Sequence, residues 1–101
     1  MDRIALEKML QAGNDNAMLQ YTLGLICFKQ KDYRAAAEHL KQALGRDDSH
    51  SASWKIYART LAALERREEA KDAYEKGISI AESKGDVQAA KEMKVFLRRL
   101  K

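Results

Sequence analysis

The sequence predicts an all-α protein whose helices pair as antiparallel hairpins. Apolar residues recur at helical spacing in six successive segments, and no segment shows the alternation of apolar and polar residues that indicates a β-strand. The polar breaks between the segments are only a few residues long. Links this short place consecutive helices side by side in opposite directions.

In chain order, the first helix is predicted over 2–12 and ends at the polar break GNDN. The second runs over 16–30, and Asn16 supplies a side-chain oxygen that can accept from the free amides of its first turn. The third runs over 33–46 after Asp32, which can act in the same way, and ends where RDDSH begins.

The fourth helix is predicted over 51–64 with Ser51 as its N-cap, and the sixth over 86–100 with Asp86 in that role. The fifth helix, over 67–83, has no capping residue before it. Two glutamates in its first turn place negative charge near the positive end of the helix dipole instead.

Composition is that of one globular domain. The chain has 101 residues, of which 46% are hydrophobic and 34% charged, and folding at this size buries over ~60% of the surface of the unfolded chain. The start, MDRIALEKMLQ, has acidic residues and no continuous apolar stretch, so we expect no signal peptide, no membrane span and a cytoplasmic location. The single cysteine, Cys27, lies on an apolar helical stripe and is predicted to be a small buried side chain.

An internal repeat organises the middle of the chain. Small residues recur where small residues stood 34 positions earlier, and large apolar residues mostly recur where large ones stood. The pairs are Gln20 and Trp54, Leu23 and Tyr57, Gly24 and Ala58, Cys27 and Leu61, Ala36 and Ala70, Leu40 and Tyr74, and Ala43 and Gly77.

Gly24 lies inside a predicted helix, where glycine costs about 1 kcal/mol relative to alanine. Where two helices cross closely, a bulky side chain would force them apart, so the contact favours glycine or alanine. We therefore predict that Gly24 is a packing residue. The alternative is a tolerated surface glycine.

With this period and these residues, the sequence resembles the tetratricopeptide repeat (TPR) family, whose helix–turn–helix unit has 34 residues. The matching signature residues are Leu23, Gly24, Ala36, Leu40 and Ala43 in a first unit over 17–50, and Trp54, Ala58, Leu61, Ala70, Tyr74 and Gly77 in a second unit over 51–84. The departures are Gln20 for the tryptophan, Cys27 for an aromatic residue, and Asp48 and Glu82 for the final proline.

The resemblance implies a right-handed α-solenoid in a single domain over 1–101, with the two full units flanked by half-units. The helix over 2–12 resembles the second helix of a unit that lost its first. The helix over 86–100 fits the family register after a slip of two residues and resembles a terminal cap. Lys94 then takes the position of Gly24 and Ala58, which is acceptable if no later helix packs there.

Enzyme motifs are absent from the sequence: it has no glycine-rich phosphate loop, G-x-S-x-G, H-E-x-x-H or C-x-x-C. The two histidines, His39 and His50, are 11 residues apart in different settings, which argues against shared metal ligation. Glu68 and Glu69 are adjacent and point to different helix faces, so a solvated helix start explains them better than acid–base catalysis. We expect neither catalysis nor a cofactor or metal.

The resemblance implies that a peptide or helical segment of a protein partner binds in a concave groove lined by the first helix of each unit. The groove residues implied are Met18, Tyr21, Leu25, Phe28, Lys29, Lys55, Arg59, Ala62, Ala63, Lys91, Val95 and Arg98. Apolar groups lie at one end and cations at the other, which suits a partner with acidic and hydrophobic character. Alternatively, the N-terminal helix or a second copy of the chain covers Tyr21, Leu25 and Phe28.

One TPR subtype is not predicted. Members that hold acidic chaperone tails carry lysine, arginine and asparagine at five groove positions, and none of these agrees here. The matching residues are Tyr21, Leu25, Ile56, Gln88 and Glu92.

Two further hypotheses follow from charge and architecture. The net charge is +4, and the last eleven residues hold five basic residues and one acidic residue. A solvated helix face explains this pattern, and the alternatives are attraction to nucleic acid, to an anionic membrane or to an acidic protein surface. The cations are Lys91, Lys94, Arg98, Arg99 and Lys101, with no stacking aromatic residues interleaved on that face. A purely structural role as a homodimer is the other hypothesis, because a two-unit array has exposed ends.

Overall fold

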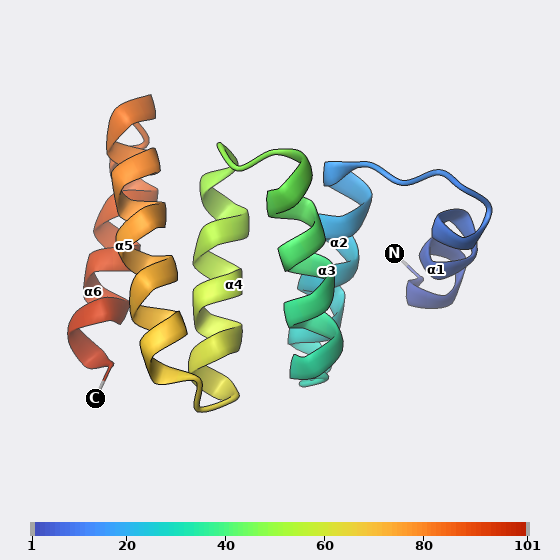
Figure 1. Ribbon diagram of the computed structural model, residues 1–101, viewed down its shortest axis with the longest axis horizontal. Coiled ribbons are helices and arrows are strands. Elements are labelled where there is room, and N and C mark those ends of the chain that lie inside the picture. The colour runs from blue at the N-terminus through green and yellow to red at the C-terminus, as the bar shows by residue number, and fades with distance from the viewer. Residues whose placement is uncertain (1, 101) are drawn as a thin grey trace.

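The computed structural model describes residues 2–100, and within this range the protein consists of six α-helices and no strand. They are α1 (Arg3–Gln11), α2 (Ala17–Lys29), α3 (Tyr33–Arg46), α4 (Ser51–Ala63), α5 (Arg67–Lys84) and α6 (Val87–Arg99). The helices stand in a row along the longest dimension of a body of 39 × 28 × 20 Å (Figure 1). Each boundary lies within one residue of its predicted position, so the all-α prediction is confirmed.

The helices pair as predicted. α2 and α3 form one antiparallel hairpin, α4 and α5 form the next, and α6 packs against α5 and α4 as α4 packs against α3 and α2. Gly77 makes the approach of α5 to α6 possible, because a Cβ atom there would lie 2.6 Å from the sulfur of Met93. In Figure 1, α3 and α5 face the viewer, with α2 behind α3 and α6 behind α5. We call the side formed by α2, α4 and α6 the inner wall, and the side formed by α3 and α5 the outer face.

The turns inside the two hairpins share one backbone motif. Lys31 and Glu65, which are 34 residues apart, both have positive φ angles, of 64° and 61°. The following amides, of Asp32 and Arg66, each donate to a carbonyl five residues earlier at 2.9 Å. The 34-residue interval read from side chains is therefore also the interval of the backbone.

Side-chain caps start three helices where the sequence predicts them. Asn16, Asp32 and Asp86 each accept from the amide three residues later. The prediction for Ser51 is wrong, because α4 already includes Ser51 and His50 is the N-cap, without a side-chain cap bond. The Ser51 hydroxyl is buried and has no hydrogen-bond partner among the described residues.

Gly24 is a packing residue, as predicted. A Cβ atom at this position would lie 2.6 Å from Cγ and 2.8 Å from Cδ2 of Leu40, whose side chain is completely buried. The equivalent residues of the second hairpin, Ala58 and Tyr74, are buried in one apolar cluster. Small residues therefore recur because the same close crossing recurs.

The departure at Gln20 has a structural compensation. Trp54, its equivalent, is buried and donates from its indole N–H to the carbonyl of Asp48 at 2.7 Å. Gln20 is equally buried, and its amide donates to Asp15 at 3.1 Å while its oxygen lies 2.8 Å from Nδ1 of His39. A polar network thus replaces the indole in the first unit.

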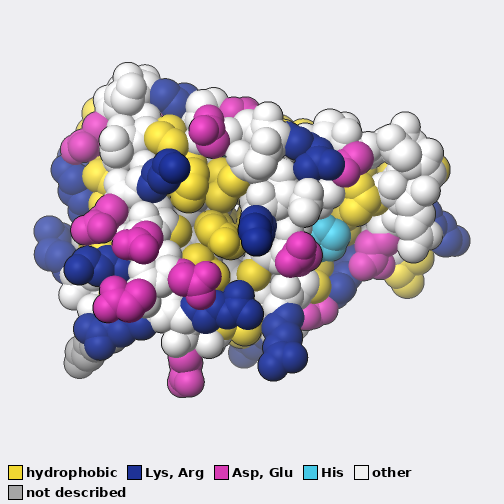
Figure 2. Space-filling view, viewed as in Figure 1, with side chains coloured by type: hydrophobic (Ala, Val, Ile, Leu, Met, Phe, Trp, Pro, Cys, Tyr) yellow, Lys and Arg dark blue, Asp and Glu magenta, His cyan; other side chains and the backbone are white. Residues whose placement is uncertain are grey.

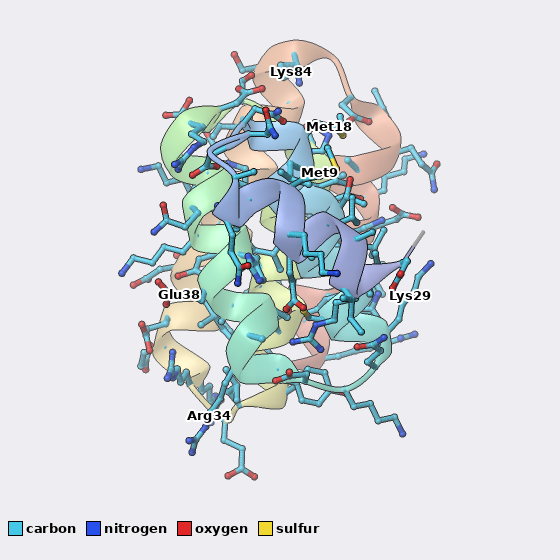
Figure 3. The ribbon with its side chains drawn as sticks, turned by 90° about the vertical axis from the view of Figure 1, so that its right-hand side faces the viewer. Met9, Met18, Lys29, Arg34, Glu38 and Lys84 are labelled. Carbon is cyan, nitrogen blue, oxygen red and sulfur yellow. The ribbon has the colours of Figure 1, made fainter. Side chains whose placement is uncertain are left out.

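Among the helices, α1 packs only against α2. Its apolar contacts join Leu6 and Leu10 to Leu19, Leu23 and Ile26. Arg3 adds an ion pair with Asp32, with 3.0 Å between Nη2 and Oδ2. Viewed from this end of the row, α1 crosses in front of the first hairpin, and Met9 is 46% exposed (Figure 3).

Within residues 2–100, no helix combines the length and the apolar content that crossing a lipid bilayer requires. We propose that the chain is divided as the sequence predicts, into units over 17–50 and 51–84 with a flanking helix at each end.

Candidate functional site

The inner wall carries the residues that the resemblance implies for the groove. They are Met18, Tyr21, Leu25, Phe28 and Lys29 on α2, Lys55, Arg59, Ala62 and Ala63 on α4, and Lys91, Val95 and Arg98 on α6. Their surroundings differ along the wall, from apolar and aromatic at α2 to charged at α4 and α6.

The α2 part of the wall is not used by α1. Tyr21, Leu25 and Phe28 pack against the cluster that joins α2 to α3 and α4, whereas α1 packs on other α2 residues. All three side chains are partly exposed, and Met18 at the start of α2 is 61% exposed. Apolar and aromatic surface therefore remains accessible here.

In the first turns of α2, Tyr21 contacts His50, which lies in the loop between the two hairpins. Its ring lies edge-on to His50, with 4.7 Å between centroids and an interplanar angle of 83°. The cavity beside this pair has a volume of about 170 Å³ and is lined by Ala17, Met18, Tyr21, Ala43, Asp47 and His50.

Lys55 already has an acidic partner within the chain. Its Nζ lies 2.9 Å from Oε1 of Glu92 on α6. The hydrogen bond and charge of Lys55 lower the pKa of the Glu92 carboxyl below its ordinary value. The positive charge of Lys55 is thus balanced inside the wall.

Arg59 is held differently. Its guanidinium carbon lies 4.9 Å from the ring centroid of Phe28 on α2 and 4.7 Å from that of Phe96 on α6. Phe96 in turn stacks on Tyr74 at 6.3 Å and 13°. Among residues 2–100, no carboxylate lies within ion-pair distance of the Arg59 side chain and no acceptor binds it.

A second cavity, of about 220 Å³, lies beside this stack. It is lined by Arg59, Ala62, Tyr74, Phe96, Arg99 and Leu100. Burial raises the pKa of Tyr74 to about 12, so its phenol stays uncharged at neutral pH. The charged groups lining the cavity are therefore two arginines.

On α6, the sequence reasoning missed the residues that meet α4. It assigned Lys91, Val95 and Arg98, whereas the contacts with Lys55 and Arg59 are made by the neighbouring Glu92 and Phe96. Glu92 and Phe96 directly follow Lys91 and Val95 in the sequence and therefore lie about 100° further around the helix. The sequence shows that the chain has only two phenylalanines, Phe28 and Phe96, but only the structure shows that both contact Arg59.

The outer face shows mixed charges around a strip of apolar side chains between α3 and α5 (Figure 2). A cavity of about 210 Å³ there is lined by Trp54, Tyr57, Leu61, Glu69, Asp72, Ala73 and Lys76. The Lys76 ammonium lies 5.8 Å from the Trp54 ring centroid. The charged groups that line this cavity are two acids and one base, so it lacks the cationic bias of the inner wall.

The histidines take part in local hydrogen bonds. His39 meets Gln20, and His50 Nδ1 lies 2.6 Å from the hydroxyl of Ser53. Among residues 2–100, no group of three or more His, Cys, Asp or Glu side chains is arranged to hold a metal ion.

The positions of the chaperone-tail clamp have other roles here. Ile56 is 5% exposed and belongs to the core, and Glu92 pairs with Lys55.

Comparisons with known proteins identify the family. Residues 4–77 match the family model described as anaphase-promoting complex, cyclosome, subunit 3. The TPR repeat-containing protein PA0015 of Pseudomonas aeruginosa is 43% identical over 95 residues, which is 94% of this chain and 90% of that protein. The solution structure of protein BPP2914 from Bordetella parapertussis is similar with a TM-score of 0.86 and 41% identity, covering 99% of this chain and 87% of that one. With this relative, this family model and the 34-residue hairpin repeat, the chain belongs to the tetratricopeptide repeat family.

Proposed function

We propose that this protein is a non-enzymatic interaction module that binds a peptide or helical segment of another protein on its inner wall. Repeat arrays of this kind present extended surfaces for protein partners. The segment has acidic and apolar side chains.

The observation that carries the proposal is the accessible surface of Tyr21, Leu25 and Phe28 next to an arginine that has no acidic partner among residues 2–100. An apolar side chain of the partner would cover the aromatic part. An acidic side chain would meet the cationic part, where charge complementarity also speeds association.

The test is a charge reversal on the wall. The probe is a set of peptides selected on the wild-type protein from a random twelve-residue library. We expect the double variant Lys55→Glu with Arg59→Glu to lose binding of these peptides while circular dichroism shows the same helix content. Undiminished binding by this variant would remove the inner wall from the proposal.

A matched control lies on the outer face. Lys41→Glu with Lys71→Glu makes the same charge change at two exposed lysines of α3 and α5. We expect this variant to bind the peptides as the wild type does, because its substitutions lie on the opposite side.

A second candidate function is structural self-association. Three large apolar side chains near the N-terminal end, Ile4, Met9 and Met18, are 61%, 46% and 61% exposed. Exposed apolar groups at the end of a repeat array favour contact with a second copy. Sedimentation over a concentration series separates the two: a homodimer sediments faster as concentration rises, and a monomeric module does not.

The basic residues of α6 support nucleic-acid binding less strongly than the inner wall supports protein binding. Lys91, Lys94, Arg98 and Arg99 are exposed, but Lys94 pairs with Glu82 at 2.8 Å. A mobility shift of RNA or DNA that persists at moderate salt would support this role.

A further inference from the structure

Arg59 is set apart from the other cations of the inner wall by its position between two aromatic rings. Phe28 and Phe96 come from α2 and α6, the two helices that flank α4 on the inner wall. Cation–π contacts of this kind hold a guanidinium in one orientation and are stronger where water is excluded.

This arrangement leaves the N–H groups at the edge of the guanidinium to an external acceptor. Both ring contacts are made by the guanidinium carbon, whereas the donors of this planar group lie at its edge, in a fork that matches a carboxylate. Among the described residues no such acceptor is present. Lys55, one helical turn earlier, is instead neutralised by Glu92 at 2.9 Å.

The residues around Arg59 favour a partner segment in which a carboxylate lies next to apolar side chains. The adjacent cavity of about 220 Å³ adds the guanidinium of Arg99 and the apolar groups of Ala62 and Leu100. Two cations and apolar walls suit one negative charge beside a hydrophobic side chain.

The wall also indicates which kind of carboxylate fits. It continues on both sides of Arg59, toward Leu25 on α2 and toward Arg99 on α6. A segment that spans both sides passes Arg59 with its middle and not with its end. An aspartate or glutamate side chain inside the segment therefore fits better than a free C-terminus.

We propose that Arg59, held by Phe28 and Phe96, is the residue that selects partner segments by an internal Asp or Glu side chain. The inference rests on the proposed function of the inner wall and names the group that the wall recognises. Phe28 and Phe96 are positioning residues, because they act through Arg59.

The experiment is a double-mutant cycle with the library-selected peptides. In each peptide the acidic residue is replaced by its amide, Asp by Asn or Glu by Gln. We expect this change to weaken binding to the wild type about 10-fold or more, as for a hydrogen bond to a charged group. Binding to Arg59→Gln should be equally weak for the acidic and the amide peptide.

Three comparisons make the outcome specific. Arg59→Lys keeps the charge and loses the planar fork, so it should bind the acidic peptide several-fold more weakly than the wild type. Lys41→Gln, at an exposed position of α3 on the outer face, should leave the preference for the acidic peptide intact. Amidating the C-terminus of the peptide should change nothing, whereas a loss of binding would assign the site to a terminal carboxylate and overturn our inference.

Locating the bound peptides distinguishes an error about Arg59 from an error about the inner wall as the binding surface. NMR shift mapping on the wild type locates the peptides on α2, α4 and α6 or elsewhere. Peptides that bind the inner wall equally well as acid and amide would overturn the role of Arg59 and leave the wall as the binding surface. Peptides that bind elsewhere, or a library that yields none, would overturn both.

Discussion

At the scale of single residues, glycine has opposite roles at two positions of the same hairpin. Gly24 lies at the crossing of α2 and α3, with Leu40 in the way of any side chain. Gly45 lies on the exposed side of α3, and a Cβ atom there would meet nothing within 4 Å. Substitutions at these two glycines therefore distinguish the effect of packing on stability from the effect of helix propensity.

We expect Gly24→Leu to lower the free energy of unfolding by ~1–3 kcal/mol or more, because it overfills the crossing. Gly24→Ala should gain little or lose stability, because the approach to Leu40 opposes its helix propensity. Gly45→Ala is the control and should gain up to ~1 kcal/mol. Urea unfolding measures all three, and a leucine variant as stable as the wild type would contradict the packing role.

His39 gives the protein a pH-dependent term in its stability. Burial lowers the pKa of its imidazole, so the folded state holds the neutral form more strongly than the unfolded state does. As pH falls below the unfolded value of about 6.5, the unfolded state takes up the proton first and stability decreases until the folded pKa is passed. We expect NMR titration to place this pKa below the ordinary value, and His39→Gln to flatten the dependence; an unchanged slope would assign it to other groups.

At the scale of elements, the two hairpin turns have the same backbone and different caps. Asp32 has φ and ψ of −89° and 76° and caps α3, whereas Arg66 has −89° and 70° and gives α5 no side-chain bond. The repeat thus places an arginine where its geometry accommodates a capping residue.

Arg66→Asp should consequently stabilise the protein by ~0.5–2 kcal/mol, through a new cap and a favourable charge at the helix start. Arg66→Asn tests the cap without the added charge and should retain part of the gain. Thermal melts measure both effects. A variant no more stable than the wild type would show that the turn leaves the side chain no access to the free amides.

At the scale of the whole molecule, the helices differ in how many neighbours hold them. α4 packs against α2, α3, α5 and α6, whereas α1 packs against α2 alone. In a repeat array stability is a sum over neighbouring interfaces, so the ends open before the centre.

Native-state hydrogen exchange should therefore be fastest in α1 and slowest in α4. Leu6→Ala removes the buried side chain of α1 and should accelerate exchange in α1 much more than in α4. Met9→Ala, at an exposed position of the same helix, is the control. Equal protection of α1 and α4 in the wild type would show that the array unfolds as one cooperative unit.

Much of the fold could be predicted because it depends on local and repeated features. Apolar spacing gave the six helices to within one residue, and Gly24 with Ala58 identified the recurring crossing. The error at Ser51 arose because a serine just before an apolar stripe can stand at the N-cap or one residue inside the helix. In the structure His50 takes the N-cap position, and Ser51 is buried in the first turn of α4.

The sequence by itself determined the helices, the 34-residue hairpin and the family, because each depends on residue patterns that recur along the chain. Only the tertiary structure decided which cations of the inner wall have a carboxylate partner among residues 2–100. Lys55 meets Glu92 from 37 residues away, and Arg59 meets Phe28 and Phe96 from two other helices. These contacts depend on which face α6 turns toward α4. Because α6 departs from the register of the two full units, the sequence repeat does not predict that face.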